Sequence, residues 1–346
     1  MDLNSISRIW RTAAATVCVA ALAACSSSTV DEPDDGRMPL TFKVSAADSR
    51  AAATKSTFET EGCAFNVWGL FYNPSDVTGT FPVFDARTVT FSSGSWSYDN
   101  EEYWMPGFTY EFRALYPAVL PQGATVVYTT GSGADSHIAV NGFTARGTDL
   151  MSASDRRMVF ADGSTQPAVD LKFRHLLSRV TFRGRSDDRY LGSDGKPDAD
   201  ARKVKVKSFR VSGISDSGSW DGTTFSADGS SLGGWTHGER TAVYTATIGA
   251  EGLQLGNEPV DIFGDEVILA IPQNFTALRI EIVYEFTEGS LGEQTATSTL
   301  AGTWLPGKSY SYNFALNTHI FFDIPVVEDW TTAPVNINDL NIDLPR

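Results

Sequence analysis

One of the two cysteines near the start of this chain lies where a covalent modification is easiest to predict. Cys25 follows the sequence Leu-Ala-Ala at residues 22–24. Residues 12–24 carry no charge, follow two arginines, and number only 13, too few to cross a bilayer as a helix. This pattern predicts a lipoprotein signal peptide over residues 1–24, with a lipid on the thiol of Cys25. The alternative is an ordinary secretory signal followed by an incidental cysteine.

The segment after this cysteine is short and acidic. Residues 25–38 hold four Asp or Glu side chains, a proline and a glycine, and they are predicted to form a solvated tether. Because Cys18 leaves with the signal and Cys25 is lipidated, Cys63 would be the only other cysteine, which excludes an internal disulfide. The net charge of -15, with both signs spread along the chain, argues against a nucleic-acid partner. The outer membrane is then a partner through the lipid alone.

Other residue patterns that could carry chemistry are weak. Residues 229–233 match Gly-x-Ser-x-Gly, but a nucleophile elbow needs a strand before the serine and a helix after it, and here a Gly/Ser loop is predicted. The acidic loop at 187–200 lacks the residue order of an EF-hand. His175 lies among apolar residues and is interpreted as a core or interface histidine, and no two histidines have metal-ligand spacing. We therefore predict no catalytic residue, metal or cofactor, and no enzyme.

The elements that would position any site are strands. Apolar and polar residues alternate over residues 110–116, 169–174 and 278–286, as in strands with one buried face. Between such runs lie clusters of Gly, Ser, Asn and Asp, and no clear helical period appears. In residues 203–211 the alternation shifts by one residue after Ser208, which predicts a β-bulge. The predicted fold class is all-β, as β-sandwiches or barrels.

The chain is too long for one sandwich of about 100 residues, so two are predicted. The turn-rich segment 161–167 is the preferred boundary, which gives an N-terminal sandwich over 39–165 and a C-terminal sandwich over 166–346. The charged loop at 187–200 is the rival boundary, but it separates two alternating runs that look like neighbours in one sheet.

A set of short motifs, in this order, resembles the fimbrillin family, the Mfa-like and FimA-like lipoproteins of Bacteroidetes. They are FNVWGLF at 65–71, YWMP at 103–106, ALYP at 114–117, DLM at 149–151, FRHLLSRV at 173–180, IPQ at 271–273, WLPGKSY at 304–310 and DW at 329–330. The resemblance implies two transthyretin-like Greek-key β-sandwich domains and export as a lipoprotein to the cell surface. It also implies assembly with other pilus subunits into a type V pilus, as a stalk, tip or adhesin subunit.

The first predicted strand is a candidate for removal. Leu40, Phe42 and Val44 alternate with polar residues, and the polar, alanine-rich stretch that follows is typical of a cleavable loop. In the resembled family a trypsin-like surface protease cuts after an arginine just beyond this strand, and Arg50, before Ala51, matches that position best. Cleavage there would open an apolar groove that demands a replacement strand. Arg37 and Lys55 are rival cleavage positions, and a retained strand in a permanently anchored subunit is the alternative.

The C-terminal tail, 331–346, is patterned as a strand and is the predicted replacement. Its apolar residues alternate with Asn and Asp, and they are Val335, Ile337, Leu340, Ile342 and Leu344. As a donor strand it would enter the groove of the neighbouring subunit, with main-chain hydrogen bonds and alternate side chains in pockets. The alternative is that the tail folds back as an edge strand of its own domain.

A surface glycan-binding lipoprotein with no filament role is the second predicted function. It would need aromatic side chains on a solvent-facing surface, and Trp96, Trp220 and Trp235 lie in turn-rich regions where they could be exposed.

Overall fold

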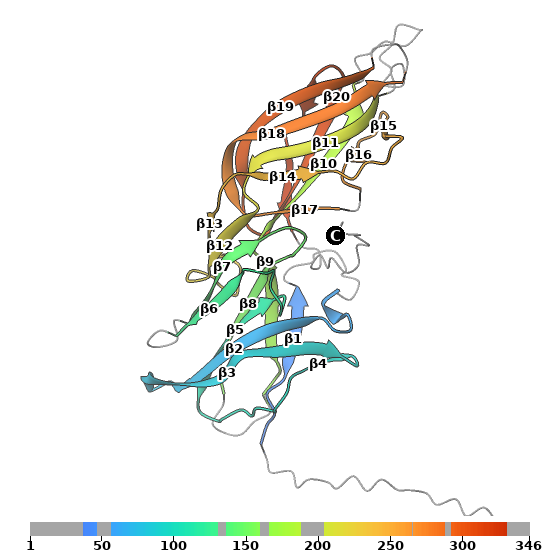
Figure 1. Cartoon of the computed structure of the whole chain (residues 1–346). Helices are drawn as coiled ribbons and strands as arrows, with labels where there is room; N and C mark the ends of the chain where they lie inside the picture. The colour runs from blue at the N-terminus through green and yellow to red at the C-terminus, as the bar shows by residue number, and fades with distance from the viewer. Residues whose placement is uncertain are drawn as a thin grey trace, which may run out of the picture. The chain divides into compact units, whose positions relative to one another are not determined.

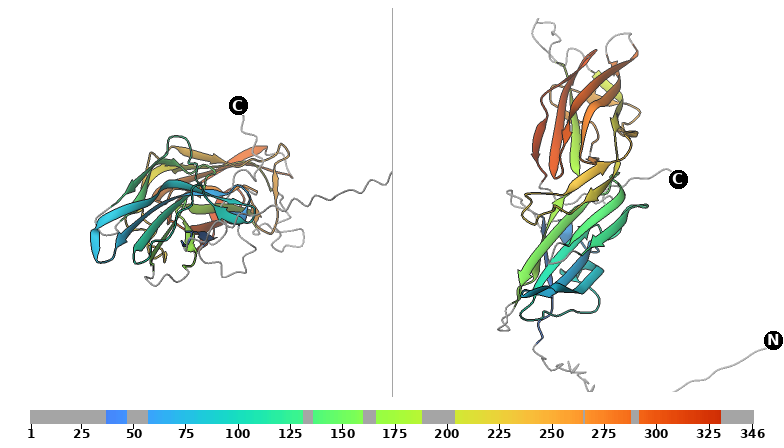
Figure 2. Two further views of the ribbon diagram at one scale, coloured as in Figure 1. Left: turned by 90° about the horizontal axis from the view of Figure 1, so that it is seen from below. Right: turned by 90° about the vertical axis from the view of Figure 1, so that its left-hand side faces the viewer.

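A computed structural model gives the structure of the chain. It describes residues 37–46, 57–130, 136–159, 166–187, 204–264, 266–287 and 292–330. Cys25, Arg50, Ala51 and the tail 331–346 therefore lie outside the described residues. The described residues from Met38 onward form one compact unit, shown in Figures 1 and 2.

The described residues form twenty-two strands and one 3-10 turn, η1 (Thr57–Glu59). The predicted all-β fold is confirmed. No helix among the described residues has the length and apolar character that a membrane span requires. Greek-key connectivity stays a prediction.

The largest sheet has seven strands and begins at its edge with β1. In spatial order they are β1 (Phe42–Ala46), β9 (Val169–His175), β8 (Met151–Met158), β5 (Thr109–Tyr116), β2 (Ala64–Asn73), β3 (Asp76–Ser92) and β4 (Ser95–Ser97). Both faces of its central strands are covered, because Phe65 and Val67 of β2 belong to one apolar core while Trp68 belongs to another. This double burial explains why β2 reads as a nearly continuous apolar run.

Two further sheets pack face to face around a second core. One contains β16 (Val260–Asp261), β10 (Ser178–Ser186), β20 (Lys308–Leu316) and β21 (Ile320–Phe322), with β17 (Ile268–Ala270) on β10 and β22 (Val326–Asp329) on β20. The other contains β14 (Ala242–Thr245), β11 (Val204–Ile214), β18 (Gln273–Phe286) and β19 (Glu293–Trp304), with β15 (Leu253–Leu255) on β11. Phe182 and Phe314 of the first sheet and Phe209 of the second meet in this core, so these sheets form a sandwich.

A four-stranded sheet packs on the face of the seven-stranded sheet that carries Trp68. Figure 1 shows its strands beside those of the larger sheet. Its order is β13 (Gly234–His237), β12 (Ser217–Asp221), β7 (His137–Thr144) and β6 (Thr125–Thr129). The apolar cluster beneath it joins Val140 and Trp220 of this sheet to Trp68 of β2 and Ile271 beside β18.

The predicted bulge in β11 is confirmed. The register of β11 on β18 shifts between Val206 and Ser208, so Lys207 is the extra residue. The domain boundary near residue 166 stays a prediction. The chain passes from the seven-stranded sheet to the next sheet slightly later, between His175 and Ser178.

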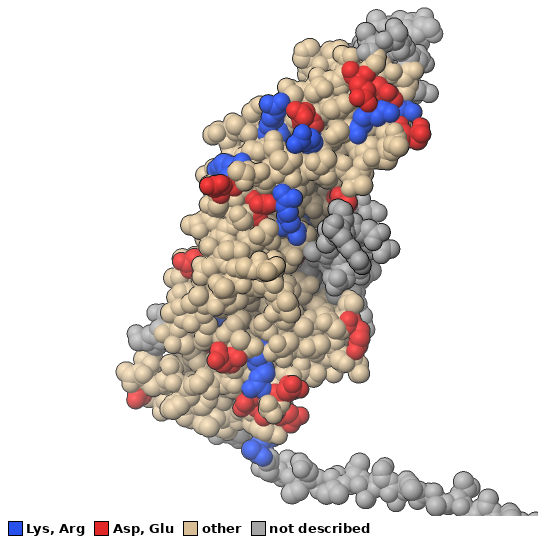
Figure 3. Space-filling view, in the orientation of Figure 1, with Lys and Arg blue, Asp and Glu red and all other residues tan. Residues whose placement is uncertain are grey.

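Charged side chains of both signs are interspersed on the face that Figure 3 shows. Neither sign forms a continuous stripe there. This agrees with the spread of charges along the sequence and offers no cationic track for a nucleic acid on this face.

Candidate functional site

The first strand, β1, forms one edge of the seven-stranded sheet. It pairs in parallel with β9, with Phe42 opposite Val169 and Val44 opposite Leu171. Just before the strand, the amide of Leu40 donates to the carbonyl of Glu102 at 2.7 Å. The start of the chain is therefore held between β9 on one side and the residues around 102 on the other.

Three side chains of this first segment point into the core, as the alternation predicts. Leu40 is 1% exposed, and Phe42 and Val44 are each 7% exposed. Thr41 and Lys43 between them are exposed. Burying three such side chains stabilises the fold by about 1.5–3 kcal/mol each, as an upper bound. One short strand at an edge thus carries a sizeable part of this core.

Four aromatic rings surround Phe42. Its ring centroid lies 5.6 Å from Phe84, 5.7 Å from Tyr98, and 6.2 Å from both Phe65 and Phe112. These distances and the mostly tilted or edge-on angles are those of favourable aromatic pairs. If the strand left, this pocket and the edge of β9 would both be exposed.

The hydroxyl of Tyr98 locks the segment before β1. It donates to the carbonyl of Leu40 at 2.7 Å and accepts from the amide of Glu102 at 3.2 Å. Burial raises the pKa of Tyr98, so the hydroxyl keeps its proton and remains a donor.

The chain is anchored again soon after β1. Phe58, in η1, is fully buried, and its ring lies 5.3 Å from Tyr116 and 5.2 Å from Phe173. Arg50 and Ala51 fall between these two anchors. A cut after Arg50 would therefore detach Leu40, Phe42 and Val44 and leave Phe58 in the core.

A second anchor fixes the point from which the tail departs. The indole of Trp330 stacks on the imidazole of His175, with centroids 3.7 Å apart and an interplanar angle of 7°. His175 Nδ1 lies 2.8 Å from Asp149 Oδ2, and both side chains are buried. The amide of Trp330 also donates to the carbonyl of Gly307 at 2.8 Å. His175 is a core residue, as predicted, and it is the last residue of β9.

Trp330, the last described residue before the tail, thus lies at the end of β9, the strand that pairs with β1. Val335, Ile337, Leu340, Ile342 and Leu344 lie outside the described residues, so their role as a donor strand stays a prediction. No sequence pattern predicts the stack of Trp330 on His175, because the two residues are far apart along the chain.

The structure gives a different outcome for each candidate catalytic or sugar-binding residue. The Gly-x-Ser-x-Gly stretch lies in a loop between β12 and β13, so a strand and not a helix follows it, as the sequence predicts. Trp220 is 1% exposed, and its prediction as a solvent-facing platform is wrong because its indole fills the core beneath the four-stranded sheet. Trp96 is half-buried and packs on Phe65 and Phe91. Trp235 is half-buried and lines a groove.

Comparison with known families identifies the chain. The model of a family described as fimbrillin-like matches residues 49–330. The chain belongs to the fimbrillin-like family. The predicted resemblance is therefore confirmed, and family membership supports a cell-surface role as a pilus subunit or adhesin.

Several solved structures are similar to this fimbrillin-like protein. A candidate cell adhesion protein from Bacteroides uniformis is 18% identical, covers 86% of this chain and 100% of its own, and has a TM-score of 0.50. A candidate cell adhesion protein from Bacteroides ovatus is 13% identical, with coverage of 85% and 97% and a TM-score of 0.45. A fimbrial assembly protein from Parabacteroides distasonis is 10% identical, with coverage of 85% and 96% and a TM-score of 0.38. The likeness to the first of these shows the fold alone. No curated protein matches the chain.

Proposed function

We propose that this fimbrillin-like chain is a structural subunit of a type V pilus, a stalk or a tip adhesin, which polymerises by donor-strand exchange. The observation that carries the proposal is the edge strand β1, whose buried Phe42 fills a pocket of four aromatic rings. A removable strand of this kind leaves an apolar groove that only another strand can cover. The partners are other pilus subunits and a trypsin-like surface protease.

Cleavage after Arg50 is the step that would start assembly. Because Phe58 holds the chain on the far side of this position, the cut releases β1 together with its lipid and leaves the rest of the core in place. The subunit then passes from an anchored precursor at the outer membrane to the growing fimbrium at the cell surface.

We expect the Arg50→Ala precursor to stay lipidated and outside filaments. The physical reason is that a trypsin-like protease requires Arg or Lys before the cut bond, and β1 then remains in its groove. N-terminal sequencing of wild-type filament protein should begin at Ala51. The Lys55→Ala variant is the matched control and should assemble normally. Filament protein that begins at Met38, or that retains Cys25, would contradict the assignment.

The lipid site has its own test. The Cys25→Ala variant should lose acyl labelling and retention in the membrane fraction, because each buried methylene of the lipid contributes about 0.8 kcal/mol to membrane binding. Labelled fatty acid and detergent-phase partitioning measure both effects.

Cys63→Ala is the control for this test and should label as the wild type does. Burial raises the pKa of the Cys63 thiol to about 11, so at neutral pH it is not the reactive thiolate. Unchanged labelling of Cys25→Ala would contradict the lipidation site.

The variants of Arg50 and Cys25 test the cleavage site and the lipid site. A separate experiment tests the role in the filament. Electron microscopy of cells with an antibody to this protein places it along the shaft for a stalk subunit and at one end for a tip subunit. Labelled cells without filaments would favour the glycan-binding lipoprotein with no filament role.

A further inference from the structure

A groove of about 430 Å³ lies where the four-stranded sheet meets the sandwich formed by the second and third sheets. It is built from the edge strand β13 and the residues after it, the start of β18, and the end of β19 with the turn that follows. Two of the short motifs, at 271–273 and 304–310, come together here because Gln273 pairs with Trp304 in the β18–β19 ladder. Its volume is within the range of small-molecule sites.

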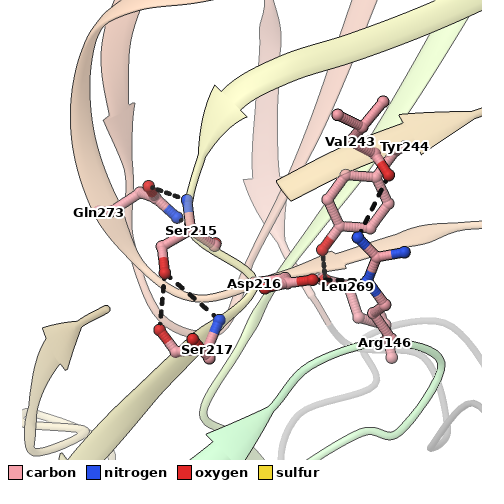
Figure 4. Close-up of polar contacts among 8 residues, drawn as sticks. All are labelled: Arg146, Ser215, Asp216, Ser217, Val243, Tyr244, Leu269 and Gln273. Atoms are coloured by element: carbon pink, nitrogen blue, oxygen red, sulfur yellow. Dashed lines mark hydrogen bonds and ion pairs between the residues drawn. The ribbon is translucent and has the colours of Figure 1, made fainter. Parts of the chain in front are cut away.

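The floor of the groove is rigid. Gln273 is 5% exposed, and its side-chain oxygen accepts from the amide of Ser215 at 3.0 Å. Its Nε2 donates to the carbonyl of Ser215 at 2.8 Å, and Figure 4 shows these two side chains together. The same Nε2 also donates to the carbonyl of Ile271 at 2.9 Å. Since these bonds use both hydrogens of Nε2 and one acceptor position of the oxygen, Gln273 shapes the groove and has no amide hydrogen left to donate to a ligand.

The same connection, residues 215–217, is fixed on its other side. Arg146 pairs with Asp216 at 2.5 Å, and its guanidinium lies 5.3 Å from the ring centroid of Tyr244 (Figure 4). Ser215 Oγ donates to the carbonyl of Ser217 at 2.8 Å. The groove is therefore preformed, which lowers the entropy cost of binding.

One wall is the half-buried indole of Trp235. Its Nε1–H donates to the carbonyl of Leu176 at 2.7 Å, and Phe143 packs on it at a centroid distance of 6.1 Å. Because the N–H is already used, Trp235 offers the groove apolar ring surface and no donor. Leu305, 50% exposed, adds further apolar surface to the lining.

The charge of the groove is positive. His237 Nδ1 lies 3.0 Å from the carbonyl oxygen of Gly238, and Arg240 Nη2 lies 3.3 Å from His237 Nε2. No Asp or Glu lines the groove, and among the described residues no carboxylate forms an ion pair with Arg240. In a chain of net charge -15 this is a local exception. A cationic ligand on the aromatic wall is disfavoured, and an anion is favoured.

The groove also contains an uncharged hydrogen-bond donor. Asn274 lines the groove, and its Oδ1 accepts from Thr303 Oγ1 at 2.7 Å, so its Nδ2 is the side-chain atom that can donate to a ligand oxygen. The groove thus combines an apolar aromatic wall, one guanidinium and one amide donor.

We propose that this groove binds a carboxylated sugar, such as a hexuronic acid residue of a glycan. One face of a pyranose ring is apolar and lies on Trp235, the carboxylate accepts from Arg240, and a ring hydroxyl accepts from Asn274. Guanidinium and carboxylate have matching planar geometry. A phosphate ion would satisfy Arg240 but leaves the aromatic wall uncovered. The site is independent of donor-strand exchange and would give a pilus subunit its own receptor contact.

Isothermal titration of the full chain in detergent with digalacturonate, and with its neutral counterpart galactobiose, tests the proposal. We expect digalacturonate to bind at least about tenfold more tightly than galactobiose. The exposed Arg240→Gln change should weaken digalacturonate binding about tenfold to a hundredfold, the loss typical of a charged hydrogen bond. Arg279→Gln, an exposed arginine of β18 outside the groove, is the matched control and should leave binding unchanged.

Several results would overturn the proposal. They are no binding of digalacturonate, equal binding of both sugars, and equal binding by wild type and Arg240→Gln. Equal competition by inorganic phosphate would show a plain anion site, and equal competition by an acidic peptide would show a peptide site. Cells that carry Arg240→Gln should assemble filaments normally. A failure of the sugar-binding proposal can therefore be told apart from a failure of the proposed pilus role.

Discussion

Deletion of residues 331–346 is expected to give a folded monomer that no longer polymerises after cleavage at Arg50. The five apolar side chains of this tail, at about 1.5–3 kcal/mol each, would bury roughly 7–15 kcal/mol of gross hydrophobic free energy in a neighbour's groove, before the cost of ordering the tail. Without them nothing replaces β1. Sedimentation or electron microscopy of the cleaved protein measures the loss of polymer.

The described residues explain why the truncated chain should still fold. β22 is paired with β20 along four residues, from Lys308 opposite Asp329 to Ser311 opposite Val326. Trp330 then stacks on His175 and bonds to Gly307. The last element before the tail is therefore held by its own contacts, and the cut after Trp330 removes none of them.

A substitution series separates the pattern of the tail from its length. Replacing Leu340, Ile342 and Leu344 by Asn should abolish polymerisation as deletion does. Replacing the alternate residues Asn341 and Asp343 by Ser should leave it intact, because those side chains would face solvent in the groove. If the truncated protein unfolds, the tail belongs to the core of its own chain and the donor role is wrong.

The strands could be predicted because apolar and polar residues alternate along a strand that has one buried face. Val169, Leu171 and Phe173 are buried on one face of β9, and the phase change at Ser208 is a real bulge. What alternation cannot supply is the partner of each strand. The pairing of β1 with β9 joins Phe42 to Val169, and no local pattern of residues encodes a contact across that separation.

The same reason limits the prediction of the sites. The alternation of apolar and polar residues alone predicts the burial of Leu40, Phe42 and Val44. It does not predict the four rings around Phe42, because these come from β2, β3, β5 and the segment after β4. Trp220 and Trp235 both lie near glycine-rich turns in the sequence. Their environments differ because Trp220 is on a central strand of its sheet and Trp235 is on an edge strand.

The pocket around Phe42 gives the sharpest test of the edge strand. Phe42→Ala in the uncleaved precursor should lower the free energy of unfolding by about 3–5 kcal/mol, the usual loss when a buried phenylalanine is truncated. The ring is 7% exposed and contacts four aromatic rings, so few atoms can move to fill the space. Urea unfolding followed by tryptophan fluorescence measures the change.

The same substitution should act in the opposite direction on assembly. After cleavage, β1 is held only by non-covalent contacts, and every 1.4 kcal/mol removed from them favours its release about tenfold. Cleaved Phe42→Ala protein should therefore lose β1, and begin to polymerise, more than about a hundredfold faster than cleaved wild type. Lys43→Ala, at the exposed position between Phe42 and Val44, is the matched control and should change neither stability nor rate. A destabilised precursor whose cleaved form polymerises at the wild-type rate would show that the departure of β1 from its groove is not the step that limits assembly.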